Sequence, residues 1–460
     1  MTAGRPPGGG RTAGEGAATP TTLDLLCSGQ LAGARRLALR CELTEFPREI
    51  FALADTLEEL DLSGNALSTL PEDLARLHRL RVLFCSNNHF TELPAALGRC
   101  GSLEMIGFKA NRIRTLPAEA LPPALRWLIL TDNEIDALPP AIGRCTQIQK
   151  LMLAGNRLQT LPPELAGCRA LELLRISANR LDGLPDWLPA LPRLAWLAFA
   201  GNPFDERAEA AAVEAAAIPR VDWQRLSLHG KLGEGASGVI HRADWAQEDG
   251  SVLAVAVKLF KGEVTSDGWP HSEMAACIAA GTHPNLIAVE GRVQDHPDGR
   301  SGLVLSLVDP RFRNLAGPPS LDSCTRDVYA DDASWPVTTA LRLASGIASA
   351  AAQLHARGIV HGDLYAHNIL WDGEGNALLG DFGAASFLPP DNANQALALQ
   401  RIEARAFGLL LGELRSRCRP ASNADHAVLE RWAELERRCT QPQVAERPRL
   451  AEIASALATA

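Results

Sequence analysis

The chain has 460 residues, which is more than a single hydrophobic core usually organises, so we expect at least one domain boundary. Hydrophobic residues make up 46% of the sequence and charged residues 22%, close to the averages of globular proteins, which excludes a mainly disordered or fibrous architecture. The net charge of -9, without a dense lysine and arginine cluster, argues against nucleic acid as a partner.

The N-terminal residues 1–22 are rich in Gly, Pro, Ala and Thr and lack the apolar core of a signal peptide, so we expect a flexible tail. Apolar runs further along the chain are interrupted by charged residues before the ~20 residues that a membrane helix needs. We therefore expect a cytoplasmic protein without a membrane span. The 40 arginines against five lysines favour a G+C-rich, bacterial genome.

Asparagines recur every 22 or 23 residues in the N-terminal half, within the frame Leu-x-x-Leu-x-Leu-x-x-Asn-x-Leu-x-x-Leu-Pro. They stand at positions 65, 88, 111, 133, 156, 179 and 202. Each copy can supply one short parallel strand with inward leucines, while the asparagine satisfies backbone groups at the turn that follows. The pattern resembles that of leucine-rich-repeat proteins, and we expect an α/β solenoid over residues 23–215 with its strands on the concave face.

The outward positions of these strands are largely apolar, which is unusual for a surface exposed to water. The candidate partner-binding residues are Phe84, Met105, Trp127, Ile129, Met152 and Trp196, and Val82 and Leu173 complete the apolar stripe. We expect a protein partner or substrate to bind there. The alternative is that a flanking segment or the chain's own second domain covers the stripe, in an intramolecular contact.

The repeat frame ends at Asn202, and the stretch 209–217 is rich in Ala and Glu, residues that favour a helix. We interpret this helix as a cap that closes the solenoid. The domain boundary is predicted near residue 215, and a second domain is expected over residues 216–460.

A glycine-rich loop of the form G-x-G-x-x-G-x-V opens the second domain, and the sequence Val-Ala-Val-Lys ends twenty residues later at Lys258. Glycines at such spacing let backbone amides approach phosphate oxygens, and a lysine at the end of a strand can pair with those phosphates. Glu273 follows in a predicted helix over residues 272–280, where its carboxylate could hold the lysine. The loop residues are Gly233, Gly235, Gly238 and Val239.

Three further polar residues complete the set that phosphoryl transfer requires. Asp363 and Asn368 lie in the stretch His-Gly-Asp-Leu-Tyr-Ala-His-Asn, and Asp381 lies in Gly-Asp-Phe-Gly. Transfer to a hydroxyl needs one carboxylate near the acceptor proton and oxygen ligands for Mg²⁺, because charge builds up on the transferring oxygens. Their order and spacing favour an enzyme.

With these motifs, residues 223–460 resemble the eukaryotic-type protein kinase family, in its tyrosine-kinase-like serine/threonine branch. The resemblance implies an α+β bilobal fold, with Asp363 as catalytic base, Lys258 and Glu273 as the ion pair of the active arrangement, and Asn368 and Asp381 as magnesium ligands. It also implies that the loop glycines cover ATP. The remaining implied nucleotide contacts are Val239, Ala256, Leu305, Leu307 and Leu370.

The sequence also departs from the family pattern. Gly362 stands where most members have arginine, and Tyr365 stands where they have lysine. No cation stands four residues after Asp363 unless His367 is protonated. The Ala-Pro-Glu motif is absent and the segment that normally docks a peptide is short, which leaves Arg447 without its expected glutamate partner.

The sequence therefore predicts an ATP- and Mg²⁺-dependent protein kinase that phosphorylates serine or threonine of a partner recruited by the repeats. Two alternatives stay open. One is a catalytically weak or inactive scaffold whose repeats bind a partner, and the other is a kinase with a small-molecule acceptor.

Overall fold

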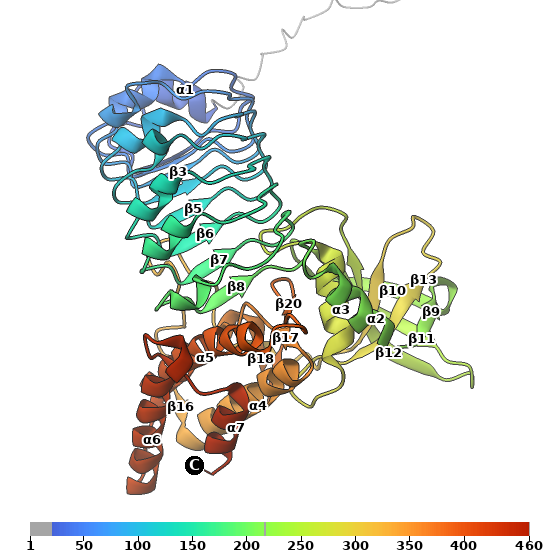
Figure 1. Ribbon diagram of the computed structural model, residues 1–460. Coiled ribbons are helices and arrows are strands. Elements are labelled where there is room, and N and C mark those ends of the chain that lie inside the picture. Colours follow the sequence, from blue (N-terminus) through green and yellow to red (C-terminus); the bar gives the residue numbers. More distant parts are fainter. Residues whose placement is uncertain (1–20, 216–217, 460) are drawn as a thin grey trace, which may run out of the picture.

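A computed structural model describes residues 21–215 and 218–459; the tail predicted for residues 1–22 lies almost entirely outside this range. The chain forms a solenoid followed by a two-lobed α+β domain, as predicted (Figure 1). A short helix, α1 (Thr22–Cys27), precedes the first rung. One parallel sheet then runs through the solenoid in sequence order, with strands β1 (Arg36–Ala38), β2 (Glu59–Asp61), β3 (Val82–Phe84), β4 (Met105–Gly107), β5 (Trp127–Ile129), β6 (Lys150–Met152), β7 (Leu173–Arg175) and β8 (Trp196–Ala198).

The recurring asparagines explain why the rungs repeat at a fixed length. Asn65 donates from Nδ2 to the carbonyls of Leu39 and Leu62, each at 2.8 Å, and its Oδ1 accepts from the amide of Leu43 at 3.0 Å. One side chain thus ties each turn to the preceding rung and satisfies backbone groups that would otherwise be buried without partners. The frame leucines point inward and share one continuous core.

The small lobe of the second domain is a six-stranded sheet that carries helix α3 (Pro270–Ala280). Its strands, in spatial order, are β10 (Leu226–Glu234), β11 (Gly238–Ala246), β12 (Val252–Phe260), β14 (Gly302–Ser306), β13 (Val289–Gln294) and β9 (Arg220–Asp222). Because β9 pairs in parallel with β13, the segment that leaves the solenoid becomes an edge of this sheet.

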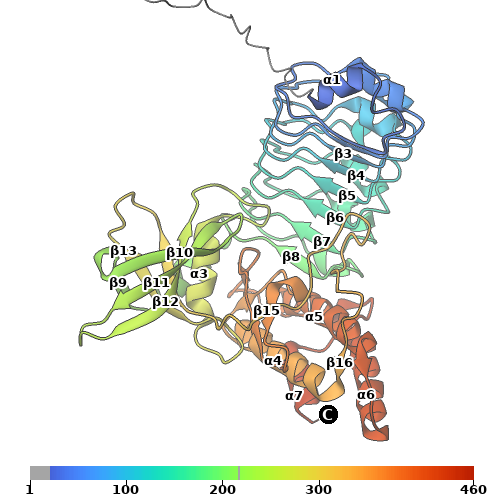
Figure 2. The ribbon, with the colours of Figure 1, turned by 180° about the vertical axis from the view of Figure 1, so that it is seen from behind.

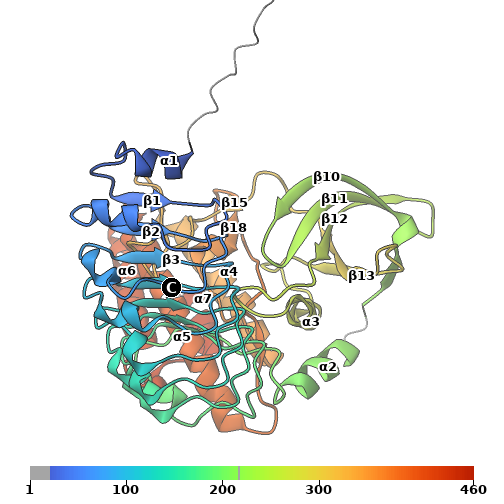
Figure 3. The same ribbon diagram turned by 90° about the horizontal axis from the view of Figure 1, so that it is seen from above.

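The helix expected after the solenoid is present as α2 (Glu206–Ala215), but it does more than cap the last rung. It packs against α3, and Ser272 of α3 donates to Glu209 of α2 at 3.0 Å (Figure 3). The helix therefore links the solenoid to the small lobe. The boundary near residue 215 stays a prediction.

The large lobe is mostly helical. Its helices are α4 (Val337–Ala356), α5 (Ala393–Ser416), α6 (Asn423–Cys439) and α7 (Leu450–Ala458), and its short strands are β15 (Arg313–Asn314), β16 (Trp335–Pro336), β17 (Ile359–Val360), β18 (Ile369–Trp371), β19 (Ala377–Leu379), β20 (Ser386–Phe387) and β21 (Cys418–Arg419). Among the described residues, no helix combines the length and the apolar character needed to cross a membrane.

The last rungs of the solenoid pack directly on the large lobe (Figures 1 and 2). Buried residues of the lobe join the core of the solenoid, among them Leu388, Leu399 and Ile402. Leu173 and Trp196 of the solenoid in turn belong to the core of the lobe. The two halves therefore share buried apolar surface, as the layers of one domain do.

This packing corrects part of the expectation for the concave face. Val82, Met105, Leu173 and Trp196 are buried, with Trp196 only 2% exposed, so the prediction of an exposed stripe is wrong at these four positions. The physical reason is that the chain's own second domain covers them. Residues 315–334, between β15 and β16, run along the solenoid beside its strands (Figure 2), and Arg326 in this segment pairs with Glu172 of the solenoid at 3.3 Å. The stripe residues that remain half-buried are Phe84, Trp127, Ile129 and Met152.

Candidate active site

The lysine and glutamate expected to pair do lie together. Strand β12 carries Lys258 and helix α3 carries Glu273, and their side chains form an ion pair in which the glutamate is almost fully buried. Burial lowers the pKa of the Lys258 ammonium, but the Glu273 carboxylate outweighs this effect, so its pKa is raised. The lysine therefore stays charged although its side chain is largely buried, as a phosphate contact requires.

The glycine-rich loop connects β10 to β11, and the amide of Gly235 donates to the carbonyl of Gly238 at 2.9 Å. A side-chain carbon added at Gly233 or Gly235 would meet no protein atom within 4 Å, whereas one at Gly238 would lie 2.6 Å from the carbonyl oxygen of Leu259. The protein's own packing thus explains only Gly238. The other two glycines leave an open backbone that a ligand's phosphates could approach.

The apolar residues implied to contact the nucleotide base come from several strands. Ala256 and Leu305 are register partners on β12 and β14. Val239 lies on β11, Leu307 lies just beyond β14, and Leu370 lies on β18. All three are half-buried. Leu232, beside the glycine loop, is 53% exposed.

Asp363 and Asn368 form one hydrogen-bonded unit in the loop that follows β17. Asn368 donates from Nδ2 to the Asp363 carbonyl at 2.9 Å and to Asp363 Oδ2 at 2.8 Å. This orientation leaves Asn368 Oδ1 free to accept or to ligate. His361 donates to the carbonyl of Gly380 at 2.9 Å and so ties this loop to the segment that carries Asp381.

The oxygen donors fit a magnesium ion. A carboxylate at Asp381 and an amide oxygen at Asn368 are hard ligands, and Mg²⁺ in nucleotide sites is usually held by one or two carboxylates together with phosphates and water. Within the described ranges, no group of three or more His, Cys, Asp or Glu side chains could hold a metal by itself. The arrangement therefore suits a magnesium that is shared with a bound triphosphate.

The sequence analysis missed the closest cationic partner of Asp363, which comes from the solenoid. Arg175 on β7 forms an ion pair with Asp363 Oδ1, donates to the carbonyl of Gly362 at 3.0 Å, and donates from Nε to Asp267 at 2.7 Å. Its side chain is only 2% exposed. One signal in the sequence could have found it. Arg175 is an arginine among the largely apolar outward positions of the repeat strands, and the catalytic loop lacks the family's cations.

The opposite charges of Arg175 and Asp363 keep both side chains ionised. Burial lowers the pKa of Arg175, but Asp363 and Asp267 raise it by more. Burial likewise raises the pKa of Asp363, while Arg175 and then His367 lower it, with a net decrease. The pKa of His367 is itself raised, because its hydrogen bond and charge interaction with Asp327 outweigh burial. Asp363 can therefore act as a proton acceptor at neutral pH.

Two of the departures from the family pattern also lie against the solenoid. Gly362 has a φ of 72°, and a side-chain carbon there would lie 2.4 Å from the carbonyl oxygen of Ala384 in the lobe itself and 2.7 Å from that of Leu197 in the solenoid. The Tyr365 ring stacks on Trp196, whose Nε1 donates to the carbonyl of Leu364 at 3.1 Å. An arginine at 362 would collide with the solenoid.

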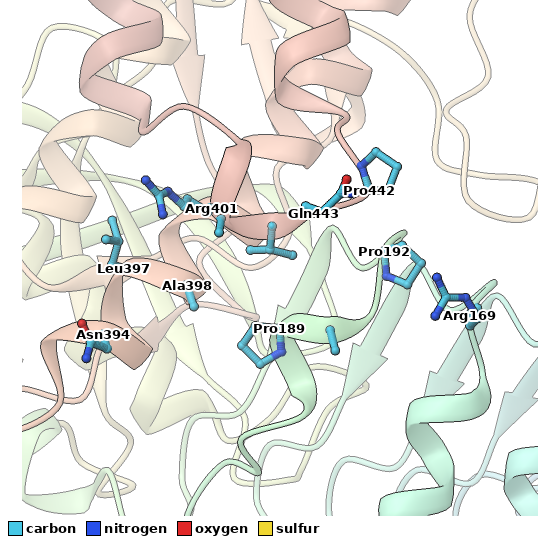
Figure 4. A pocket seen from close by; sticks show the side chains of 12 residues that line it. Arg169, Pro189, Pro192, Asn394, Leu397, Ala398, Arg401, Pro442 and Gln443 are labelled. Atoms are coloured by element: carbon cyan, nitrogen blue, oxygen red, sulfur yellow. The ribbon is translucent and has the colours of Figure 1, made fainter.

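The third departure has the same explanation. Arg447, which lacks its expected glutamate, donates instead to the carbonyls of Pro192 at 2.7 Å and of Leu194 at 3.3 Å in the solenoid. Nearby, Pro192 and Arg169 of the solenoid face Leu397 and Arg401 of α5 across a groove of about 600 Å³ (Figure 4). None of the predicted site residues lines this groove. The solenoid thus supplies partners for Arg447 and packs beside α5 of the large lobe.

Known families match separate parts of the chain. Residues 226–405 match the family described as protein tyrosine and serine/threonine kinase. Residues 123–181 match a leucine rich repeat family, and residues 55–98 match a family of two leucine rich repeat copies.

Individual relatives match only part of the chain. The L-type lectin-domain containing receptor kinase S.7 of Oryza sativa subsp. japonica is 29% identical over 205 residues, which cover 40% of this chain and 28% of that protein. The serine/threonine-protein kinase PkaA of Streptomyces coelicolor is 29% identical over 219 residues, or 41% of this chain and 38% of that protein. A solved leucine-rich-repeat protein of Leptospira interrogans covers 39% of this chain and 51% of its own at 27% identity, with a TM-score of 0.33.

Proposed function

We propose that this chain, which joins leucine-rich repeats to a protein kinase domain, is an ATP- and Mg²⁺-dependent kinase that phosphorylates serine or threonine in proteins. The observation that carries the proposal is the Asp363 carboxylate, held by Asn368 and tied through His361 to the segment of Asp381, in a domain that also contains the Lys258–Glu273 ion pair. The resemblance of this domain to PkaA, a serine/threonine kinase by name, supports serine or threonine as the residue that accepts the phosphate.

Each residue has a defined task in this proposal. Lys258, held by Glu273, would contact the phosphates of ATP, and Asp381 and Asn368 Oδ1 would hold magnesium, which would supply neutralisation of charge on the phosphate oxygens. Asp363 accepts the proton of the acceptor hydroxyl while the oxygen of that hydroxyl bonds to the γ-phosphorus. The bond from that phosphorus to the β–γ bridging oxygen breaks, and ADP leaves.

We place recruitment of the protein acceptor on the part of the concave face that the second domain leaves accessible. Trp127, Ile129 and Met152 are half-buried there, and aromatic and methionine side chains are enriched in protein interfaces. Changing Trp127 and Ile129 together to serine should raise KM for a protein acceptor and leave KM for ATP unchanged. An unchanged KM for the acceptor would remove recruitment from the proposal.

A small-molecule acceptor is the second candidate, and one observation favours it. Helix α5 begins at Ala393, only twelve residues after Asp381, and strand β8 of the solenoid contacts this helix, which leaves little chain for a peptide platform. A compact acceptor needs no such platform. Profiling of protein and metabolite acceptors with the same enzyme preparation separates the two.

The experiment that tests the proposed function uses γ-labelled ATP, Mg²⁺ and a mixture of cellular proteins. We expect label on serine and threonine with the wild type and none with Asp363→Asn or Lys258→Met. The matched controls are Asp372→Asn, in an exposed turn, and Lys109→Met, on the solenoid. Label on tyrosine alone would overturn the residue class. Equal labelling by Asp363→Asn would overturn the kinase assignment, and nucleotide-independent partner binding without transfer would favour the scaffold.

A further inference from the structure

The catalytic loop lacks the cations that its family resemblance implies, and a cation from the other half of the molecule stands beside its aspartate. We propose that Arg175 of the solenoid is a positioning residue of the phosphotransfer site, which orients the Asp363 carboxylate and completes the site from outside the kinase domain. This inference rests on the proposed function.

The geometry fixes the carboxylate from both sides. Arg175 binds Oδ1 of Asp363, while Asn368 donates to Oδ2 at 2.8 Å. An ionised carboxylate has about four lone-pair positions, so these two contacts leave acceptor capacity for a substrate proton. The orientation is therefore set without blocking the chemistry.

The guanidinium also reaches two other structural elements. It donates to the carbonyl of Gly362 at 3.0 Å and to Asp267, in the loop before α3, at 2.7 Å. A planar fork of five donors can serve three acceptors in fixed directions, which a lysine ammonium on a flexible stem does less well. Arg175 thus connects the catalytic loop to the loop that leads into the helix carrying Glu273.

The contact has the features of a permanent part of the site. Trp196 stacks on Tyr365, and the amides of Phe199 and Ala200 donate to Ser386 Oγ at 3.0 and 3.1 Å. Both halves also share buried apolar cores. Separation would expose these shared apolar cores to water, which carries a large free-energy cost. The same contact interpreted as an autoinhibitory lock predicts the opposite result in the experiment below.

The test compares full-length Arg175→Ala, Arg175→Met and Arg175→Lys with the wild type. The control is Arg157→Ala, an exposed solenoid arginine whose ion pair is with Glu134. We expect kcat to fall roughly 100-fold in the alanine and methionine variants, as misplacement of a catalytic group does. KM for ATP should change less than about twofold, because the proposal assigns Arg175 no contact with nucleotide. Arg175→Lys should recover part of kcat, and Arg157→Ala should resemble the wild type.

Unchanged kcat would overturn the proposal, and increased kcat would replace it with autoinhibition. A second readout does not depend on activity, so it tests the positioning role even if the wild type transfers no phosphate. That result would overturn the proposed function but not the positioning role. Amide hydrogen exchange of residues 361–368 should become faster in Arg175→Met and stay unchanged in Arg157→Ala. Equal exchange in the wild type, Arg175→Met and Arg157→Ala would overturn the positioning role. If Arg175→Ala and Arg175→Met do not fold, Arg175→Lys replaces them in both measurements.

Discussion

The rings of Trp196 in the last solenoid rung and Tyr365 in the catalytic loop stack at a centroid distance of 4.1 Å with an interplanar angle of 7°. Tyr365 stands where related kinases carry a lysine. The neighbouring contacts follow the same pattern, because Gly362 gives room to Leu197 and Arg447 binds carbonyls of the solenoid. The unusual residues of the kinase domain are therefore those that meet the repeats.

Gly362→Ala should disturb the site more than its backbone angle alone requires. The residue has a φ of 72°, and the new methyl group would lie 2.4 Å from the Ala384 carbonyl oxygen and 2.7 Å from the Leu197 carbonyl oxygen. Gly373→Ala is the matched control, because Gly373 has a φ of 87° and no atom within 4 Å of such a group. We expect a loss of about 1 kcal/mol of unfolding free energy in the control, and at least twice that loss with reduced phosphate transfer in Gly362→Ala. Equal losses in chemical denaturation would contradict the close approach.

Ser386→Ala should destabilise the whole chain. The buried hydroxyl accepts hydrogen bonds from the amides of Phe199 and Ala200, and both amides would lose their partner. We expect a loss of roughly 2–4 kcal/mol in unfolding free energy, against little change in the exposed Ser455→Ala. Because the halves share a core, urea denaturation followed by fluorescence and by circular dichroism should give one shifted transition. Two separate transitions, with the solenoid unaffected, would contradict this interface.

Lys150→Met should stabilise the protein at pH 7. Burial lowers the pKa of Lys150 to about 8, from 10.5, although its ammonium lies 4.1 Å from the centre of the Trp127 ring. Between these two values the unfolded chain binds the proton and the folded chain does not, so wild-type stability rises with pH across this window. The charged lysine then costs about 3 kcal/mol below pH 8, as an upper value.

Urea denaturation at pH 7 and at pH 9.5 checks this prediction. The advantage of Lys150→Met over the wild type should be large at pH 7 and should shrink at pH 9.5. Lys109→Met, on the same solenoid, should show no such trend. An advantage that does not change with pH, or a destabilised variant at pH 7, would contradict the charge cost.

The sequence predicts the parts of this molecule that depend on local spacing. The asparagine period defines the rungs, and the motifs around Gly233, Lys258 and Asp363 define the elements that carry the chemistry. The contact between Arg175 and Asp363 could not be predicted in this way, because 188 positions separate the two residues and only the packing of the halves brings them together. For the same reason, outward positions such as Trp196 could be identified but their burial could not.

The central claim is that Asp363 makes this domain transfer phosphate from ATP. Single-turnover transfer of labelled γ-phosphate from Mg²⁺-ATP, with nucleotide affinity measured in parallel by calorimetry, tests it most directly. We predict transfer by the wild type, together with unchanged affinity and no transfer by Asp363→Asn. A wild type that binds Mg²⁺-ATP without transferring its phosphate, or an Asp363→Asn variant that transfers at the wild-type rate, would contradict the account.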